Sequence, residues 1–167
     1  MKITNIKSHI LEHDLGEELG YSQQFYSKRS AHLVEIQTDE GITGWGECFG
    51  PGNVAIANKC IIEKVIQPLI IGYDPLNREV IWHRVYNLLR DHGQKGMVLQ
   101  ALSGIDIALW DWKAKKANMS LQDLLGLPPT NVPTSLTVGI NPPEIVKDRV
   151  ELILQNPQVK ALKIKLG

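Results

Sequence analysis

The feature that most restricts the fold is a strand–helix–strand pattern at the end of the sequence. An apolar stretch rich in β-formers, PTSLTVGI at 133–140, precedes PPEIVKDRVELIL at 142–154, whose apolar residues recur at helical spacing. The stretch VKALKIKLG at 159–167 then alternates like a strand. A helical crossover between two strands normally joins parallel strands, which are covered by helices. We therefore expect a βαβ unit that begins near residue 130.

Two lysines share one face of the last predicted strand. Leu162, Ile164 and Leu166 occupy the opposite face, because the side chains of a strand alternate between its two sides. The apolar face must meet the preceding helix, so the amines of Lys163 and Lys165 point away from it. An isolated pair of this kind is usually two solvated lysines, but a parallel sheet is normally covered on both faces.

A sheet that closes into a barrel would direct both lysines into its interior. Barrel enzymes hold their active sites at the C-terminal ends of the strands, where these lysines would lie. Two cations on one face disfavour each other's charge, and partial burial adds to this effect. Lys165 is nearer the mouth and is the candidate general base. Lys163 would help its neighbour to lose a proton and would attract a substrate carboxylate.

The first third of the chain carries three strand signals. They are KITNIKSHIL at 2–11, HLVEIQT at 32–38 and ITGWGEC at 42–48, with a tight turn at 39–41. These stretches predict a small antiparallel meander. The polar, Gly-containing segment 15–30 is longer than a hairpin needs, so we expect an irregular loop there, of the kind that is functional or disordered.

Helical spacing follows from residue 53 to about 126. We expect Pro68 to end the first helix and Asp74 to cap the second, with Pro75 in its first turn. Ser120 should cap a short helix that Gly126 ends. The predicted apolar faces are Ala55, Ile56, Cys60, Ile61 and Val65 in the first helix, Val80, Ile81, Val85, Leu88 and Leu89 in the second, and Val98, Ala101, Leu102, Ile105, Leu109 and Trp112 in the third.

Charge and cysteine content exclude several classes of function. The 18 Lys and Arg residues balance the 18 Asp and Glu residues, so no net field favours nucleic acid or an anionic membrane. Cys48 and Cys60 form neither a disulfide framework nor a common zinc spacing. The first residues lack the apolar core of a signal peptide, and no stretch reaches the roughly 18 apolar residues of a membrane span. We expect a cytoplasmic protein.

Four segments together resemble the mandelate racemase and muconate lactonizing branch of the enolase superfamily. GITGWGE at 41–47 looks like the end of the capping meander of that family, and ALSGIDIALWDWKAKK at 101–116 looks like its signature helix. SLQDLLG at 120–126 resembles the segment between cap and barrel, and KIK at 163–165 resembles its Lys-x-Lys motif. The resemblance implies an α+β capping domain over 1–129 and, from 130, the first βαβ unit of a TIM-like (β/α)7β barrel.

The resemblance also implies a chemistry, namely abstraction of the proton α to a carboxylate with Mg2+ stabilising the enediolate. Lys165 matches the general base and Lys163 its partner. Asp106 and Asp111 in the signature helix are expected to make structural hydrogen bonds at the contact between cap and barrel. Two loops of the cap, at 15–28 and 48–52, correspond to the loops that contribute to specificity. The residues expected to contact substrate are Thr137, Tyr21, Phe25, Tyr26 and Phe49, although Thr137 is equally typical of an ordinary strand and loop aromatics often pack locally.

Several alternatives stay open. An acid-sugar dehydratase is the leading expectation, because the run at 91–111 looks most like that group. The alternative is a racemase, dipeptide epimerase or lactonizing enzyme, which the residues after 130 favour. A small carboxylate is the expected substrate, and a homo-oligomer the expected assembly. The barrel of this family needs about two hundred further residues, which would carry the Mg2+ ligands, so we expect the chain alone to be inactive. A hypothesis of another class is a non-catalytic oligomerisation or binding module.

Overall fold

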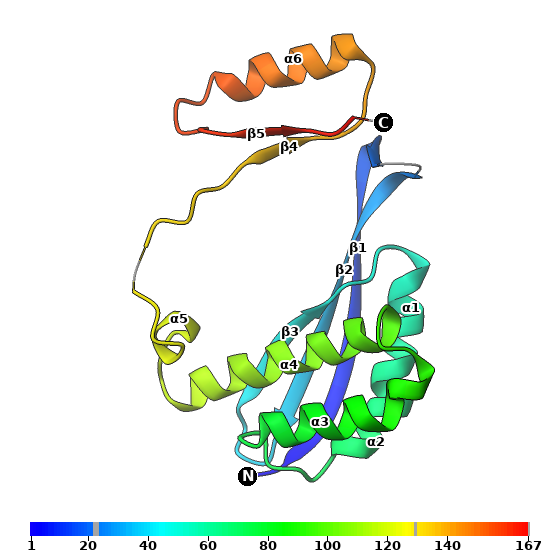
Figure 1. Ribbon diagram of the computed structural model, residues 1–167, viewed down its shortest axis with the longest axis vertical. Coiled ribbons are helices and arrows are strands. Elements are labelled where there is room, and N and C mark those ends of the chain that lie inside the picture. Colours follow the sequence, from blue (N-terminus) through cyan, green and yellow to red (C-terminus); the bar gives the residue numbers. More distant parts are fainter. Residues whose placement is uncertain (22–23, 129, 167) are drawn as a thin grey trace. The chain divides into compact units, whose positions relative to one another are not determined.

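A computed structural model describes residues 1–21, 24–128 and 130–166 and, for Tyr21 and Gln24, the backbone only. The chain forms two compact units. Met1–His13 and Ser30–Pro128 make the first, which we call the cap unit, and Asp14–Arg29 with Pro129–Gly167 make the second, which we call the lysine unit. Figure 1 shows the elements of each unit.

The cap unit is built on a three-stranded sheet. Strands β1 (Ile3–Tyr21), β2 (Gln24–Thr38) and β3 (Thr43–Cys48) lie in the order β1-β2-β3. β2 and β3 are antiparallel, with Glu35 opposite Trp45. Gly41 takes φ +77° in the turn between them, a conformation that glycine adopts without steric cost. The predicted meander is confirmed.

The prediction of an irregular loop over residues 15–30 is wrong for the residues of that segment that the structure describes. β1 extends to Tyr21 and β2 begins at Gln24, so the two strands continue as a long ribbon. The polar composition misled the prediction, because a two-stranded ribbon has no apolar face to reveal by alternation. Gly16 interrupts the extended backbone with φ +68°, and its N–H donates to Asp14 Oδ1 at 2.9 Å.

Helices pack on one face of the sheet, and Figure 1 shows α4 running across β3. The long helix α4 buries Ala101, Leu102, Ile105, Leu109 and Trp112, as its spacing predicts. The helices of this unit are α1 (Asn53–Cys60), the π-helical η1 (Ile61–Ile66), α2 (Gln67–Ile70), α3 (Arg78–Leu89), the 3-10 helix η2 (Arg90–His92), α4 (Met97–Lys116) and α5 (Leu121–Leu124).

The apolar face predicted for the first helix is right for Ala55, which is buried, and for Ile61, which packs against the core, but wrong for its other three residues. Ile56 is 62% exposed and Val65 40% exposed, and Cys60 is also exposed. The side chains that face the core instead recur every four residues, at Asn58, Ile62, Ile66 and Ile70, together with Ala55. In an α-helix four residues advance about 400°, so such a stripe drifts by about 40° at each step. The wider π turns of η1 advance less per residue and bring the stripe back toward the sheet.

Pro68 does not end this helical segment. The backbone N–H of Gln67 donates to Ile62 O, five residues back, which is the π pattern. Ile71 N then donates to Gln67 O at 3.0 Å, and the chain continues through α2. The π turn directly before Pro68 thus shifts the bonding pattern where a proline has no N–H to donate.

The starts of the later helices match the sequence signals only in part. Helix α3 begins at Arg78 after Asn77, so Asp74 is not its cap. Asp74 Oδ1 instead accepts from Leu76 N at 2.9 Å in the preceding turn. α3 buries Ile81, Val85 and Leu89, whereas Val80 and Leu88 are 56% and 52% exposed. In α5 the predictions hold, because Ser120 Oγ accepts from Asp123 N at 3.0 Å and Gly126 has φ +70°.

Two glycines of β3 let the backbone of α4 approach the sheet closely. A Cβ at Gly44 would lie 2.1 Å from Ala108 O, and a Cβ at Gly46 would lie 2.1 Å from Gly104 O. Neither distance is sterically possible, so only glycine fits at these positions. This explains the Gly-x-Gly spacing within GITGWGE.

The described part of the lysine unit contains a parallel two-stranded sheet and a helix. β4 (Leu136–Val138) pairs in parallel with β5 (Leu162–Ile164), and α6 (Pro143–Leu154) connects them. Figure 1 shows α6 running alongside both strands. The predicted βαβ unit is therefore present, with shorter strands than the sequence pattern suggested.

Candidate functional site

The parallel pairing of β4 and β5 places Thr137 directly opposite Lys163. Residues in register on neighbouring strands point to the same side of the sheet, and Lys165 lies two residues further along that side. The backbone N–H of Lys165 donates to Val138 O at 3.1 Å, which continues the ladder past the end of β5. Three of the predicted site residues therefore share one face near the C-terminal ends of the two strands.

The apolar residues of both strands lie on the opposite side, toward α6. Val138 is 2% exposed, and a groove of about 620 Å³ between helix and sheet is lined by Val146, Val150, Ile164 and Leu166, among others. Ile164 and Leu166 remain 45% and 89% exposed. These apolar residues of the last strand thus line the groove beside α6, as expected, and Lys165 also borders this groove.

The tip of the β1–β2 ribbon belongs to the same unit as the lysines. Gly20 forms an antiparallel bridge with Ile140, two residues beyond β4, and Ile140 N donates to Gly20 O at 3.2 Å. Arg149 of α6 pairs with Glu17. The segment expected to contribute to specificity is thus attached at the end of the sheet where the lysines lie.

The aromatic candidates differ in their surroundings. The Phe25 ring lies against Gly20, where an added Cβ would come within 2.6 Å of its Cε1, yet the side chain is 57% exposed. Tyr26 is partly buried, and its hydroxyl accepts from Arg29 at 3.4 Å. Phe49 belongs to the cap unit and is 65% exposed, whereas the side chain of Tyr21 lies outside the described residues.

The aspartates of the signature helix make their bonds within the cap unit. Asp106 pairs with Arg78 of α3 at 2.6 Å. Asp111 Oδ2 accepts from Trp45 N at 2.7 Å and pairs with Lys115. Because β3 is an edge strand, Asp111 satisfies a backbone donor that has no neighbouring strand. Both contacts are structural, as expected, but they lie inside the cap unit.

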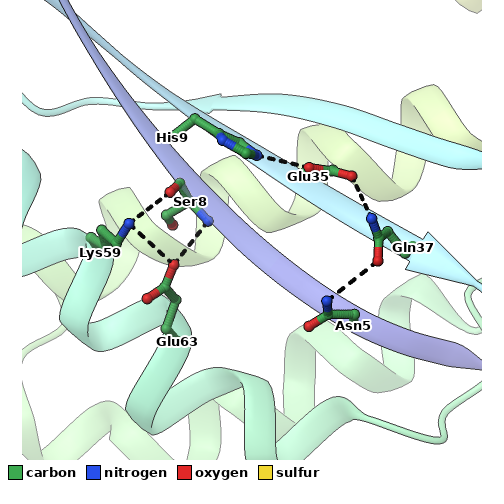
Figure 2. Close-up of polar contacts among 7 residues, drawn as sticks. All are labelled: Asn5, Ser8, His9, Glu35, Gln37, Lys59 and Glu63. Atoms are coloured by element: carbon green, nitrogen blue, oxygen red, sulfur yellow. Dashed lines mark hydrogen bonds and ion pairs between the residues drawn. The ribbon is translucent and has the colours of Figure 1, made fainter.

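Two polar networks in the cap sheet escaped the sequence analysis, and Figure 2 shows both. In one, His9 Nε2 lies 2.7 Å from Glu35 Oε2, and Gln37 donates to Glu35 Oε1 at 2.6 Å. The hydrogen bond from His9 is the main cause that lowers the pKa of Glu35. In the other, Lys59 Nζ donates to Ser8 O at 2.9 Å, and Glu63 accepts from Ser8 N at 3.0 Å. Only the i, i+4 spacing of Lys59 and Glu63 is visible in the sequence.

Within residues 1–21, 24–128 and 130–166, no group of three or more His, Cys, Asp and Glu side chains could hold a metal ion. The described residues therefore do not fit a Mg2+ site. Among the same residues, no helix is both long enough and apolar enough to cross a bilayer.

Comparison with known families gives a match over most of the cap. Residues 19–126 match the family described as Mandelate racemase / muconate lactonizing enzyme, N-terminal domain. The chain is 46% identical over 126 residues to a D-galactarolactone cycloisomerase of Agrobacterium fabrum, a match that covers 75% of this chain and 32% of the relative. It is 36% identical over 140 residues to a hydrophobic dipeptide epimerase of a Flavobacteria bacterium, covering 83% of this chain and 38% of that protein.

Solved structures extend the similarity to the lysine unit. A member of the enolase superfamily from Polaromonas sp. JS666 matches with a TM-score of 0.90 and 34% identity, covering 100% of this chain and 45% of that one. Other relatives include arabinonate, mannonate and galactonate dehydratases, and one similar dipeptide epimerase was determined with Mg and a dipeptide. The matches thus cover less than half of the length of each of these relatives.

Proposed function

The chain belongs to the mandelate racemase / muconate lactonizing enzyme family, and from this premise we propose that it supplies the cap and the base-bearing strand of an enzyme that removes the proton α to a carboxylate. The favoured reaction is acid-sugar dehydration. In this proposal residues 1–129 act as the capping domain, and the barrel begins at residue 130.

The observation that carries the proposal is the shared face of Thr137, Lys163 and Lys165. Thr137 is opposite Lys163 in a parallel pair, and the bridge between Gly20 and Ile140 attaches the ribbon tip at the same end of the strands. Parallel strands in a barrel present their C-terminal ends to the substrate. These residues are therefore arranged to meet a small molecule together.

The proposed roles follow from the chemistry of the two amines. The neutral Lys165 amine takes the α-proton, and charge accumulates on the substrate carboxylate as an enediolate forms. The Lys163 ammonium group lies beside this charge and stabilises it. Mg2+ remains a proposal for the whole enzyme, with no ligand assigned to the described residues, and no step of this scheme depends on it.

Substrate class is the least constrained part of the proposal. The 46% identical relative is named for a sugar lactone, and several others are named as acid-sugar dehydratases, so an acid sugar is favoured over a dipeptide. The dipeptide epimerases keep epimerisation as the second candidate. Phe25 and Tyr26 on the ribbon, and also Tyr21, Phe49 and Thr137, are proposed to contact the substrate.

A chimeric enzyme tests the proposed base directly. The 167-residue chain would replace the matching N-terminal part of the Agrobacterium cycloisomerase, and exchange of the α-proton would be followed by NMR in D2O with Mg2+ and a panel of acid sugars and dipeptides. We expect Lys165→Met to reduce the exchange rate about 10²- to 10⁴-fold, the usual contribution of a general base.

Matched variants separate the base from general effects of charge. Lys165→Arg keeps the cation and should lose exchange as fully as Lys165→Met. Lys160→Met removes a nearby lysine whose Nζ donates only to Pro157 O at 2.9 Å among the described contacts, and it should leave the rate unchanged. Exchange that persists at the parent rate in Lys165→Met would refute the assignment.

A further inference from the structure

A row of polar residues, one on each strand, crosses the mainly apolar side of the cap sheet that faces the helices. Ser8 lies on β1, His32 on β2 and Cys48 on β3, and His32 is directly opposite Cys48. Their exposed fractions are 4%, 1% and 1%. The neighbouring inward positions on β2, Val34 and Ile36, are apolar and fully buried, so the row is a local exception in the core.

The first helical segment covers this row with polar side chains. Asn58 is fully buried, and its Nδ2 donates to Phe49 O at 2.6 Å and to Gln100 Oε1 at 3.0 Å. The next residue, Lys59, and then Glu63 bind the backbone of Ser8, as Figure 2 shows. His32 lies opposite Cys48, whose side chain interacts with Asn58, and it is close enough to Lys59 and Glu63 for their charges to act on it.

Four buried polar atoms of this cluster have no hydrogen-bond partner among the described residues. They are Ser8 Oγ, both ring nitrogens of His32 and Asn58 Oδ1. Orphaned polar atoms are rare in folded proteins, and ordered internal water commonly satisfies them with two to four hydrogen bonds.

The protonation states of the cluster favour a neutral, two-way hydrogen-bonding ligand. Burial lowers the pKa of His32, and the nearby charge of Lys59 lowers it further, against an opposing effect of Glu63. The neutral ring then offers one donor and one acceptor. Burial also raises the pKa of the Cys48 thiol to about 11, so the thiol is protonated at neutral pH.

We propose that Ser8 and His32 of this row, together with Asn58 on the helix that covers it, hold at least one internal water molecule. Water donates to Asn58 Oδ1 and to the acceptor nitrogen of His32, and it accepts from the ring N–H or from the Ser8 hydroxyl. A metal ion lacks a sufficient ligand set here, and an anion would meet the Glu63 carboxylate.

The water gives Asn58 a positioning role. Bound at Oδ1, it fixes the orientation of the amide whose Nδ2 holds Phe49 O. Phe49 lies in the 48–52 segment, so the row would hold the backbone of a segment that is proposed to contact substrate. This consequence alone rests on the proposed function, whereas the water site does not.

Water-selective NOE and ROE spectra of the labelled 167-residue chain test the site without any activity assay. A long-lived internal water should give cross-peaks of opposite sign in the two experiments to the ring protons of His32 and the side-chain amide of Asn58. In Ser8→Ala the cross-peaks at His32 should persist, because that variant removes only an exchanging hydroxyl. Asn58→Leu should abolish them.

Thr38→Val is the matched control. Thr38 is buried on the same face of β2, but its hydroxyl donates to Ile42 O and accepts from Trp112 Nε1, both at 3.1 Å, so its loss should leave the cross-peaks at His32 unchanged. Absence of cross-peaks in the folded parent chain would overturn the proposal. Their complete loss in folded Ser8→Ala would also overturn it, since the signal would then come from the hydroxyl.

The positioning role has its own readout. Asn58→Leu should increase the backbone mobility of Phe49 and Gly50 in relaxation measurements, while Asn58→Gln should partly restore order. Unchanged mobility in Asn58→Leu would exclude this role. Because no substrate is involved, these results stand whether or not the chimera shows proton exchange.

Discussion

The long helix of each unit shows how differently the two units are stabilised. Helix α4 of the cap unit buries eight residues, whereas α6 of the lysine unit buries none. The cap sheet also has three strands, of which the shortest spans six residues, while β4 and β5 span three each. The cap unit therefore has a core of its own, and the lysine unit exposes surface that a larger barrel would cover.

Under the proposed function, this difference between the two units has a functional meaning. Loops and sites that bind substrate need exact placement but little intrinsic stability, whereas the scaffold that holds them must be rigid. The lysines lie in the less buried unit, and the ribbon tip that accompanies them is an extension of strands whose other ends are buried in the cap unit.

The largest expected effect is a loss of stability in the cap unit. Gly46→Ala places a Cβ against Gly104 O, so α4 must move away from β3. We expect a loss of about 3 kcal/mol or more in the free energy of unfolding, measured by urea denaturation. Glu47→Ala, on the exposed side of the same strand, should change stability little. A loss below about 1 kcal/mol in Gly46→Ala would show that the contact relaxes easily.

The exposed apolar surface of the lysine unit should cause self-association. Leu152, Leu154 and Leu166 are 66%, 58% and 89% exposed, and apolar surface of this kind tends to be covered by another chain. We expect Leu152→Glu combined with Leu166→Glu to weaken association by about 2 kcal/mol or more, as burial of leucine side chains contributes about 1.5–3 kcal/mol each.

Sedimentation at several protein concentrations would measure this effect. Ile56→Glu, on an exposed position of the cap unit, is the matched control and should leave association unchanged. If Ile56→Glu weakened association equally, or if the parent chain stayed monomeric at high concentration, the lysine unit would not be the surface that causes self-association. Hydrogen exchange should also be slower in α4 than in α6.

A smaller effect follows from His32 in the core of the cap unit. Because burial lowers its pKa in the folded state, the unfolded chain binds a proton that the folded chain does not. Stability is therefore unaffected above about pH 6.5 and falls as the pH drops below it, by up to about 1.4 kcal/mol per pH unit, until the lowered pKa is reached.

Denaturation curves of the parent and of His32→Gln between pH 7 and 5 would measure the contribution of His32 to the pH dependence of stability. Lys59 and Glu63 act electrostatically on His32, and Cys48 lies opposite it on β3; all three residues remain in the variant. The parent should lose more stability than the variant over this range. Parallel pH profiles would show that His32 is protonated without cost, and hence that its surroundings are more polar than its burial indicates.

Local signals predicted several features well because a short stretch contains all the information. The stripe from Ala101 to Trp112, the Ser120 cap and the turn at Gly41 depend on neighbours within a few residues. The alternation of Lys163 and Lys165 with apolar residues likewise predicted the face that meets α6.

Other features depend on partners far along the chain. In the first helical segment, Asn58 and Ile62 face the core and Ile56 and Val65 face solvent. The π turns change which side of the segment faces the core. In the described parts of the ribbon, 14–21 and 24–29, the chain forms strands that pair with each other, and Gly20 contacts Ile140, 120 positions away. No local pattern could indicate these partners.

From the sequence alone, the family resemblance, the parallel βαβ unit and the pair of amines on one strand face were already determined, because periodicity and residue type settle which side of an element is apolar. Tertiary structure alone decided which residues oppose one another: Thr137 with Lys163, Gly46 with Gly104, and His32 with Cys48. The physical reason is that strand register and close backbone packing depend on the whole core, so the enclosure of unpaired polar atoms beside His32 appears only once that core is assembled.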